Sequence, residues 1–190
     1  DGREIQLTVV DDTADPTVAV TKLRELLASD NPPDVVMNSG PSTIAEAITP
    51  ILTEEEILSF NIGPTATTGD PSVSPYNFDL SPSVDDYLGS FVAEVLDRGY
   101  ESVGVLHDTT PYGELFGTSA AAAVEEAGVE VTGIEAYDGT GLDMTAQLDK
   151  LMAGDPDALI LDSYGASLGY ILEGVEKLGW DLPIMGNTSV

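Results

Sequence analysis

The sequence predicts an α/β fold with parallel sheets, and two observations lead to that prediction. Short apolar runs rich in β-branched residues alternate with longer segments of helical period, which is typical of βαβ units. Residues 61–83 interrupt this alternation with a stretch rich in Gly, Pro, Ser and Thr. The pattern therefore predicts two βα series joined near residues 80–83. Apolar residues make up 42% of the 190-residue chain, which is enough to bury a core.

The first series is predicted to contain three strands and two helices. Asp15 followed by Pro16 indicates a helix start, because Asp accepts hydrogen bonds from free N–H groups and Pro fits the first turn. A second helix is expected from about Ser42 to Thr53. The predicted strands cover residues 5–10, 35–37 and 57–60, and a short extended piece covers residues 76–80.

The second series begins with Ser83 and Asp86, which resemble a capping box, and its first helix is predicted to end at Gly99. The expected strands are residues 103–107, 129–137, 158–162 and 183–185, and the expected helices are residues 112–127, 143–153 and 166–178. The first series has only three full strands, and the second stops after a strand. Both series look unfinished, which favours a fragment.

The charge of the chain is strongly acidic. Thirty-four Asp and Glu residues face six Lys and Arg, a formal net charge of −28. This charge argues against binding to nucleic acid or to an anionic membrane. Because the acids are scattered and Lys is rare, a solvated surface adapted to high salt is the favoured interpretation. An ordinary acidic exported protein is the alternative, and a calcium surface is disfavoured because no acidic run has the spacing of a cation loop.

The residue inventory excludes several classes of site. The chain has no Cys, so disulfides, thiol catalysis and zinc–thiolate sites are ruled out. It opens with Asp1, Gly2 and Arg3, without a Met, a signal peptide or a lipid-attachment Cys, which fits removed export signals or, as favoured here, a fragment. No apolar run approaches the 18 or more residues of a membrane span.

Two loops that follow predicted strands of the first series could bind an anion. Residues 38–43 run into a helix, and residues 63–68 follow the next strand. Both are dense in hydroxyl groups and backbone N–H donors, and a helix N-terminus favours negative charge. Plain helix capping and turn formation would explain either loop alone. Two such loops on successive strands of one sheet point to a carboxylate held by neutral donors.

Two loops of the second series each place a Tyr beside a Gly. Tyr112 lies in residues 107–113, and Tyr164 lies in residues 162–165. A Tyr offers a flat apolar wall and one hydroxyl, which suits a cleft that holds a ligand and stays partly wet. An ordinary half-buried Tyr is the alternative interpretation for both.

Enzyme motifs are absent from the sequence. No G-x-G-x-x-G or Walker A loop follows a strand, so a nucleotide cofactor is not expected, and there is no G-x-S-x-G elbow. His107 and Asp108 have no triad spacing with a Ser, and His107 is expected to be a solvated loop residue. A metal site at Asp11, Asp12 and Asp15 is less favoured than a helix start. We therefore expect no catalytic residue, no cofactor and no metal.

The order of several motifs resembles a known family. These are Asp11-Asp12 with Asp15-Pro16, Gly40-Pro41-Ser42, Pro64-Thr65-Ala66-Thr67, His107-Asp108 with Tyr112-Gly113, and Pro183-Ile184-Met185-Gly186. Together they resemble the type I periplasmic-binding fold, specifically the branched-chain amino acid (Leu/Ile/Val) substrate-binding proteins of ABC transporters. The resemblance covers essentially the whole chain. It implies two three-layer αβα domains, here as an incomplete fragment: a lobe of residues 1–81 that lacks its first βα unit, and a lobe of residues 82–190 that lacks its C-terminal return segments.

The resemblance also implies a ligand site in an interlobe cleft. Ser42, with Thr43 beside it, would meet a ligand carboxylate. Thr65, Ala66 and Thr67 would bind carboxylate and ammonium, and Tyr112 and Tyr164 would cover the ligand from the second lobe. Thr188 stands where amino-acid binders of this family place an acidic residue. A neutral residue there removes an ammonium anchor, so a carboxylate without an amine competes with a branched-chain amino acid as the expected ligand.

The function implied is capture of a small carboxylate by the extracytoplasmic, lipid-anchored component of an ABC importer, in the periplasm or at the cell surface. Its partners would be the ligand and an ABC permease in the membrane, with no nucleic acid and no cofactor. Two alternatives share the fold: a ligand-sensing receptor or regulator domain, and a binder of aromatic acids or amides.

Overall fold

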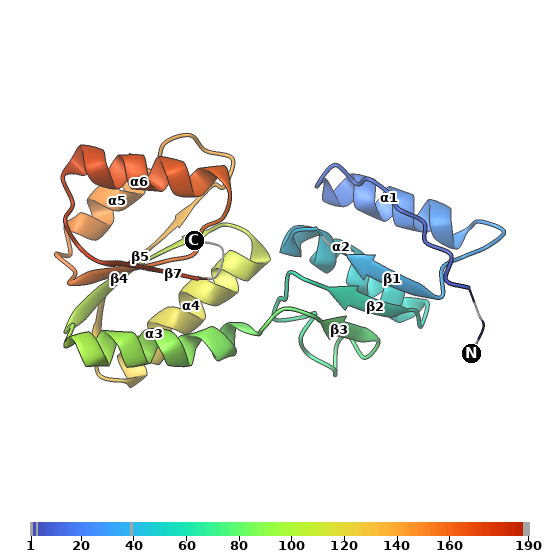
Figure 1. Cartoon of the computed structure of the whole chain (residues 1–190), viewed down its shortest axis with the longest axis horizontal. Helices are drawn as coiled ribbons and strands as arrows, with labels where there is room; N and C mark the ends of the chain where they lie inside the picture. The colour runs from blue at the N-terminus through green and yellow to red at the C-terminus, as the bar shows by residue number, and fades with distance from the viewer. Residues whose placement is uncertain (1, 3, 39, 188–190) are drawn as a thin grey trace. The chain divides into compact units, whose positions relative to one another are not determined.

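The computed structural model describes residues 2, 4–38 and 40–187, and the chain divides into two compact units, Asp1–Ser81 and Pro82–Val190. Each unit is an α/β structure with a parallel sheet, which confirms the predicted fold class (Figure 1). Among the described residues, no helix is both long enough and apolar enough to cross a membrane.

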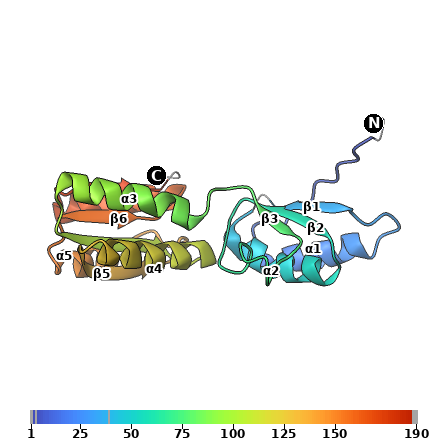
Figure 2. The same ribbon diagram turned by 90° about the horizontal axis from the view of Figure 1, so that it is seen from below.

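The first unit has a three-stranded sheet of order β1-β2-β3 and two helices. The strands are β1 (Val35–Asn38), β2 (Leu58–Asn61) and β3 (Asn77–Asp79), and the helices are α1 (Pro16–Leu27) and α2 (Ser42–Glu54). Both helices lie on the same side of the sheet (Figure 2). Their shared core joins Leu23 of α1 to Ile44 and Leu52 of α2. On the other face of the sheet, Met37 and Phe78 are exposed.

The second unit is a three-layer sandwich around a sheet of order β5-β4-β6-β7. Its elements are α3 (Val84–Arg98), β4 (Ser102–Asp108), α4 (Pro111–Glu126), β5 (Glu130–Tyr137), α5 (Thr145–Met152), β6 (Ala158–Leu161), α6 (Ala166–Leu178) and β7 (Ile184–Gly186). Helices α3 and α4 cover one face, and α5 and α6 cover the other (Figure 1). Because strand side chains alternate, Val105 packs under α3 and α4 while Leu106 packs under α5 and α6.

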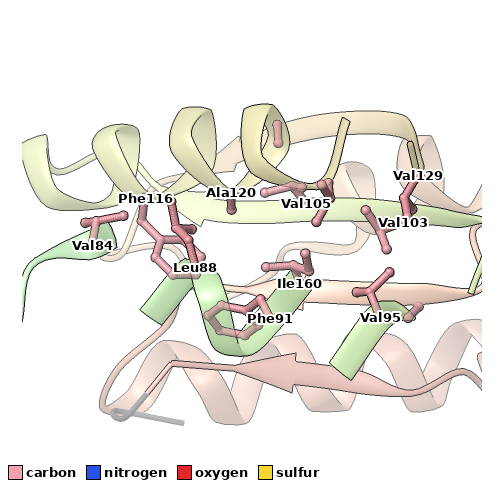
Figure 3. Packing of buried hydrophobic residues seen from close by; sticks show 13 residues of the cluster. Val84, Leu88, Phe91, Val95, Val103, Val105, Phe116, Ala120, Val129 and Ile160 are labelled. Carbon is pink, nitrogen blue, oxygen red and sulfur yellow. The ribbon is translucent and has the colours of Figure 1, made fainter. Parts of the chain in front are cut away.

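Buried apolar side chains hold α3 and α4 against the sheet. Figure 3 shows this cluster, in which Leu88 and Phe91 of α3 lie with Phe116 of α4. The rings of Phe91 and Phe116 meet edge to face with centroids 5.6 Å apart. Burial of such side chains contributes about 1.5–3 kcal/mol each, so this cluster stabilises the layer from which α4 begins.

The predicted helix starts are confirmed where capping residues were identified. Asp15 Oδ1 accepts hydrogen bonds from the N–H groups of Thr17 and Val18, at 2.7 and 3.1 Å. The carboxylate of Asp86 accepts from the N–H of Ser83 at 2.8 Å, as in a capping box, and Gly99 ends the helix in a left-handed conformation.

The prediction of a strand at residues 5–10 is wrong for this structure. These residues belong to no strand, and the side chains of Ile5, Leu7 and Val9 are 91%, 82% and 84% exposed. The alternation of apolar and polar residues is present, but a strand also needs a neighbour to accept its backbone hydrogen bonds. No described strand pairs with this segment.

Two leucines of α3, one inside and one outside the core that Figure 3 shows, test its packing. Leu88 is 9% exposed and Leu96 is 53% exposed. We expect Leu88→Ala to lower the free energy of unfolding by about 2–4 kcal/mol, because it leaves a cavity between α3 and α4. Leu96→Ala should change it by less than about 0.5 kcal/mol. Denaturant unfolding of both variants measures the difference, and equal losses would contradict the packing described.

Candidate functional site

The two hydroxyl-rich loops of the first unit leave the same edge of its sheet. Strands β1 and β2 are parallel, with Asn38 opposite Asn61, so both loops follow the carboxyl ends of neighbouring strands. The loops also touch. A Cβ built on Gly63 would lie 2.9 Å from the backbone nitrogen of Ser42 and 3.2 Å from its Cα. The absence of a side chain at Gly63 therefore lets the second loop approach the start of α2.

The first loop presents the N-terminus of α2. Ser42 is the first residue of the helix and is buried, and Thr43 beside it is half-buried. The N-cap residue is Pro41, which makes no side-chain hydrogen bond to the first turn. The N-terminal end of the α2 dipole thus lies beside the second loop, an arrangement that favours an anion.

The second loop is a turn closed by hydrogen bonds between two threonines. The N–H of Thr65 donates to Thr68 Oγ1 at 2.8 Å, and the N–H of Thr68 donates to Thr65 Oγ1 at 3.1 Å. Both residues are buried, whereas Ala66 and Thr67 between them are exposed. The turn therefore holds the backbone of Ala66 and Thr67 toward solvent at the sheet edge.

Sequence reasoning missed Glu46, which contributes an acidic group to this edge. The hydroxyl of Thr67 donates to Glu46 Oε1 at 2.6 Å. Glu46 is four residues after Ser42 on α2, so the two share one helical face, and that spacing was the available signal. The edge thus combines amide donors with a carboxylate. A group that carries both charges suits such an edge better than an anion alone, because Glu46 would repel the anion.

In the second unit, two buried carboxylates follow neighbouring strands. Asp108 ends β4 and Asp162 follows β6, and the N–H of Asp162 donates to the carbonyl of Leu106 at 2.9 Å. Both aspartates are 1% exposed. Asp108 Oδ1 accepts from the N–H of Thr110 at 2.8 Å, and Asp162 Oδ1 accepts from Asn187 Nδ2. The Oδ2 atom of each aspartate has no hydrogen-bond partner in the part of the chain that the structure describes.

This environment changes the acidity of Asp162. Burial, and then the nearby charge of Asp108, raise the pKa of Asp162 to about 7. Asp162 therefore holds a proton over much of the range below neutral pH. The sequence signal for this was a run of four apolar residues, Ala158–Leu161, directly before Asp162. In the structure all four are buried.

The two predicted tyrosines lie near this acid pair. Tyr112, in the first turn of α4, is half-buried and stacks on Phe116 at 6.3 Å between ring centroids. Burial and the charge of Asp162 raise the pKa of Tyr112 to about 12. Tyr164 is 49% exposed, and burial followed by the charges of Asp108 and Asp162 raises its pKa. Both tyrosines are thus near enough to the two carboxylates for the negative charge to raise their pKa values.

The sequence also led to predictions about His107, Thr188 and a metal site. His107 is 7% exposed and lies within β4, so the expectation of a solvated loop residue is wrong. Its Nδ1 lies 2.7 Å from the carbonyl oxygen of Asp108, and its ring fills the space beside Gly117. Thr188 lies outside the described residues. Among the residues described, no three His, Asp or Glu side chains are grouped to hold a metal ion.

The contact between the first unit's loops can be tested with two glycine substitutions. Gly63→Ala should lower the free energy of unfolding by about 1–3 kcal/mol, because its Cβ would press on the backbone of Ser42. Gly89→Ala, in α3, meets no atom within 4 Å and should raise it by roughly 0.5–1 kcal/mol. Thermal or denaturant unfolding compares the two, and a stabilising Gly63→Ala would show that the loops are apart.

The raised pKa of Asp162 predicts a pH dependence of stability. A carboxyl group whose pKa rises on folding stabilises the fold below its ordinary value of 3.8, and this contribution is lost as the pH rises to about 7. Relative to the wild type, Asp162→Asn should therefore gain roughly 2–4 kcal/mol between pH 4 and pH 8. Unfolding across that range measures the gain. Asp149→Asn, at an exposed position of α5, is the control, and a parallel pH profile for both variants would contradict the burial of an acid pair.

Comparison with known proteins places the chain in a family. Residues 1–189 match the family model described as periplasmic binding protein. A curated relative from Pseudomonas aeruginosa, the leucine-, isoleucine-, valine-, threonine- and alanine-binding protein, is 25% identical over 194 residues, which cover 100% of this chain and 50% of the relative. The chain thus spans about half the length of that relative.

Solved structures share the fold. An extracellular ligand-binding receptor from Rhodopseudomonas palustris HaA2 superimposes with a TM-score of 0.91 at 20% identity, over 100% of this chain and 52% of that one. A solute binding protein of an ABC transporter from Rhodopseudomonas palustris BisB5, in complex with 3,4-dihydroxybenzoic acid, gives 0.85 at 18% identity, over 99% and 52%. With the family match along nearly its whole length, the chain belongs to the periplasmic binding proteins.

Proposed function

We propose that the protein is the extracytoplasmic solute-binding component of an ABC importer, and that its ligand is a small carboxylate such as a branched-chain amino acid. The observation that carries the proposal is the contact between two donor-rich loops at the edge of the first sheet, where Gly63 lies against the start of α2. Membership of a family of ligand-binding proteins supports a binding role without catalysis.

The proposed role of the first unit is to bind the ligand carboxylate. Ser42 and Thr43 supply the N-terminus of α2, and the exposed residues Ala66 and Thr67 supply donors from the threonine turn. Hydrogen bonds to a charged group contribute about 1.5–3 kcal/mol each. In this proposal the buried Thr65 acts mainly through the turn, because its hydroxyl and N–H are already engaged with Thr68. In the second unit, Tyr112 and Tyr164 are proposed to supply aromatic surface for ligand binding.

The proposed ligand is an amino acid in preference to a carboxylate without an amine. Glu46 lies within hydrogen-bonding distance of Thr67, so a carboxylate bound beside it would be repelled unless the same ligand carries a positive charge. The Pseudomonas aeruginosa relative is named for binding five amino acids, which fits this chemistry.

The proposed partner is a membrane permease, which would receive the ligand from the bound form of the protein. A lipid anchor at the cell surface or in the periplasm belongs to the same proposal. The net charge of −28 is proposed to keep the protein soluble at high salt, where shorter screening lengths weaken the repulsion among its carboxylates.

Isothermal titration of the protein against small carboxylates and amino acids tests the site. Thr67→Ala and Tyr112→Ala should each weaken the ligand that binds by about 10-fold, since each removes a contact of roughly 1–2 kcal/mol. Thr118→Ala, an exposed threonine on α4, should leave the affinity within about 2-fold of the wild type. Circular dichroism checks that the variants fold. Unchanged affinity in both site variants, or no binding of any carboxylate, would remove the proposed site.

A further inference from the structure

The first unit contains an extended segment and a sheet edge that both lack a strand partner among the described residues. Residues 4–10 alternate polar and apolar side chains, as a strand does, but belong to no strand. Strand β1 lies at the end of the order β1-β2-β3, so the backbone groups on its outer side pair with no described strand. Unpaired N–H and C=O groups along such an edge are a template for pairing with another extended chain. Each copy of the protein therefore carries both halves of a strand pair.

Residues 4–10 are poorly packed against their own unit. The side chains of Ile5, Leu7 and Val9 are almost fully exposed. A hollow of about 440 Å³, lined in part by Val9 of the segment and Leu26 of α1, lies between the end of the segment and that helix. Pairing of the segment with another chain would thus bury apolar surface without first breaking a packed core.

The uncovered face of the same sheet is apolar and continuous with the edge of β1. Helices α1 and α2 both lie on the other side (Figure 2). The uncovered face carries Val35 and Met37 of β1, and the rings of Phe60 and Phe78, whose centroids are 5.9 Å apart. The one charged residue in these three strands is Asp79, which follows Phe78 and so lies on the opposite face. On a chain with 34 acidic residues, this face lets another molecule approach without meeting carboxylates.

A second copy of the chain fits this surface better than other partners do. It brings an extended segment to the edge of β1, and its own β1 offers an edge to the extended segment of the first copy. Reciprocal contacts of this kind close around a two-fold axis and stop at a dimer. An anionic membrane would be repelled by the net charge of −28. A small ligand would leave the backbone groups of β1 unpaired.

We propose that two copies of the chain associate by exchange of strands, in which residues 4–10 of each copy pair with the outer edge of β1 in the other copy. Backbone hydrogen bonds set the alignment of the pair. The exposed side chains of Ile5, Leu7 and Val9 supply apolar surface that becomes buried. The inference goes beyond the proposed function, because it assigns the first unit an interaction surface that depends on no ligand.

The charge of the chain makes this association depend on salt. Two copies of formal charge −28 repel each other at low ionic strength. The Debye length falls from about 10 Å at 0.1 M salt to about 3 Å at 1 M, so the repulsion weakens while backbone pairing and apolar burial persist. The dimer therefore forms at high salt and dissociates at low salt, which is the reverse of an interface held by ion pairs.

Sedimentation equilibrium of the 190-residue chain over a wide range of protein concentration tests the association. We expect a monomer–dimer equilibrium whose dissociation constant is at least about 10-fold lower in 1 M than in 0.1 M potassium chloride, because screening removes repulsion between the copies. A chain that stays monomeric at both salt concentrations would overturn the proposal. Assemblies that grow past the dimer, or association that is tighter at low salt, would also overturn it.

Two leucine substitutions separate strand exchange from general apolar adhesion. Leu7→Glu places a charge in the exchanged segment and should weaken the dimer by at least about 10-fold. Leu142 is 71% exposed and lies between β5 and α5 of the second unit, so Leu142→Glu adds the same charge away from the proposed interface. It should leave the dissociation constant within about 2-fold of the wild type. Equal weakening by both variants would contradict strand exchange, and circular dichroism checks that both remain folded.

Hydrogen exchange of the wild type locates the pairing without any substitution. In 1 M salt, the amides of residues 4–10 should exchange rapidly at low protein concentration and slowly at high concentration, and outer amides of residues 35–38 should follow the same trend. Protection of residues 4–10 at every concentration would indicate pairing within one chain and would overturn exchange between copies. A dimer in which residues 4–10 stay unprotected would place the interface elsewhere, with the same consequence.

Discussion

Parallel pairing of neighbouring strands is the constraint on which both candidate sites depend. In the first unit it sets Asn38 beside Asn61, and in the second it sets Leu106 beside Leu161. Parallel strands carry their following loops to the same edge of a sheet, so residues distant in sequence become neighbours there. A shift of one residue in either register would turn the strand side chains to the opposite face.

The two sheet edges differ in how deeply their carboxylates are buried. At the first edge, backbone donors and a helix N-terminus lie beside one half-buried carboxylate, Glu46. At the second edge, Asp108 and Asp162 are almost completely buried and repel each other. Most of the 34 acidic residues of the chain can be solvated at low cost, but these two cannot. Burial therefore distinguishes functional candidates from the acidic background better than composition does.

Small residues and short polar side chains hold these edges in place. Gly63 allows the threonine turn to reach α2, and Gly113 allows the start of α4 to lie against Asp108. Thr65 and Thr68 satisfy each other's backbone donors within the turn. Tyr137 donates a hydrogen bond to the carbonyl of Asp162 at 3.0 Å, which fixes the backbone from which that carboxylate projects. The polar groups of the edges are thus positioned by contacts made within each unit.

The sequence by itself determined the local features, because capping, helical period and strand alternation act between near neighbours. Asp15-Pro16, the pair Ser83 and Asp86, and the helix that ends at Gly99 follow from such rules. Only the tertiary structure decided that residues 5–10 pair with none of the described strands, that His107 is buried, that Glu46 meets Thr67, and that Asp162 lies near Asp108. Each of these depends on groups far apart in sequence, and backbone pairing, burial and electrostatic interaction are set by distance in space.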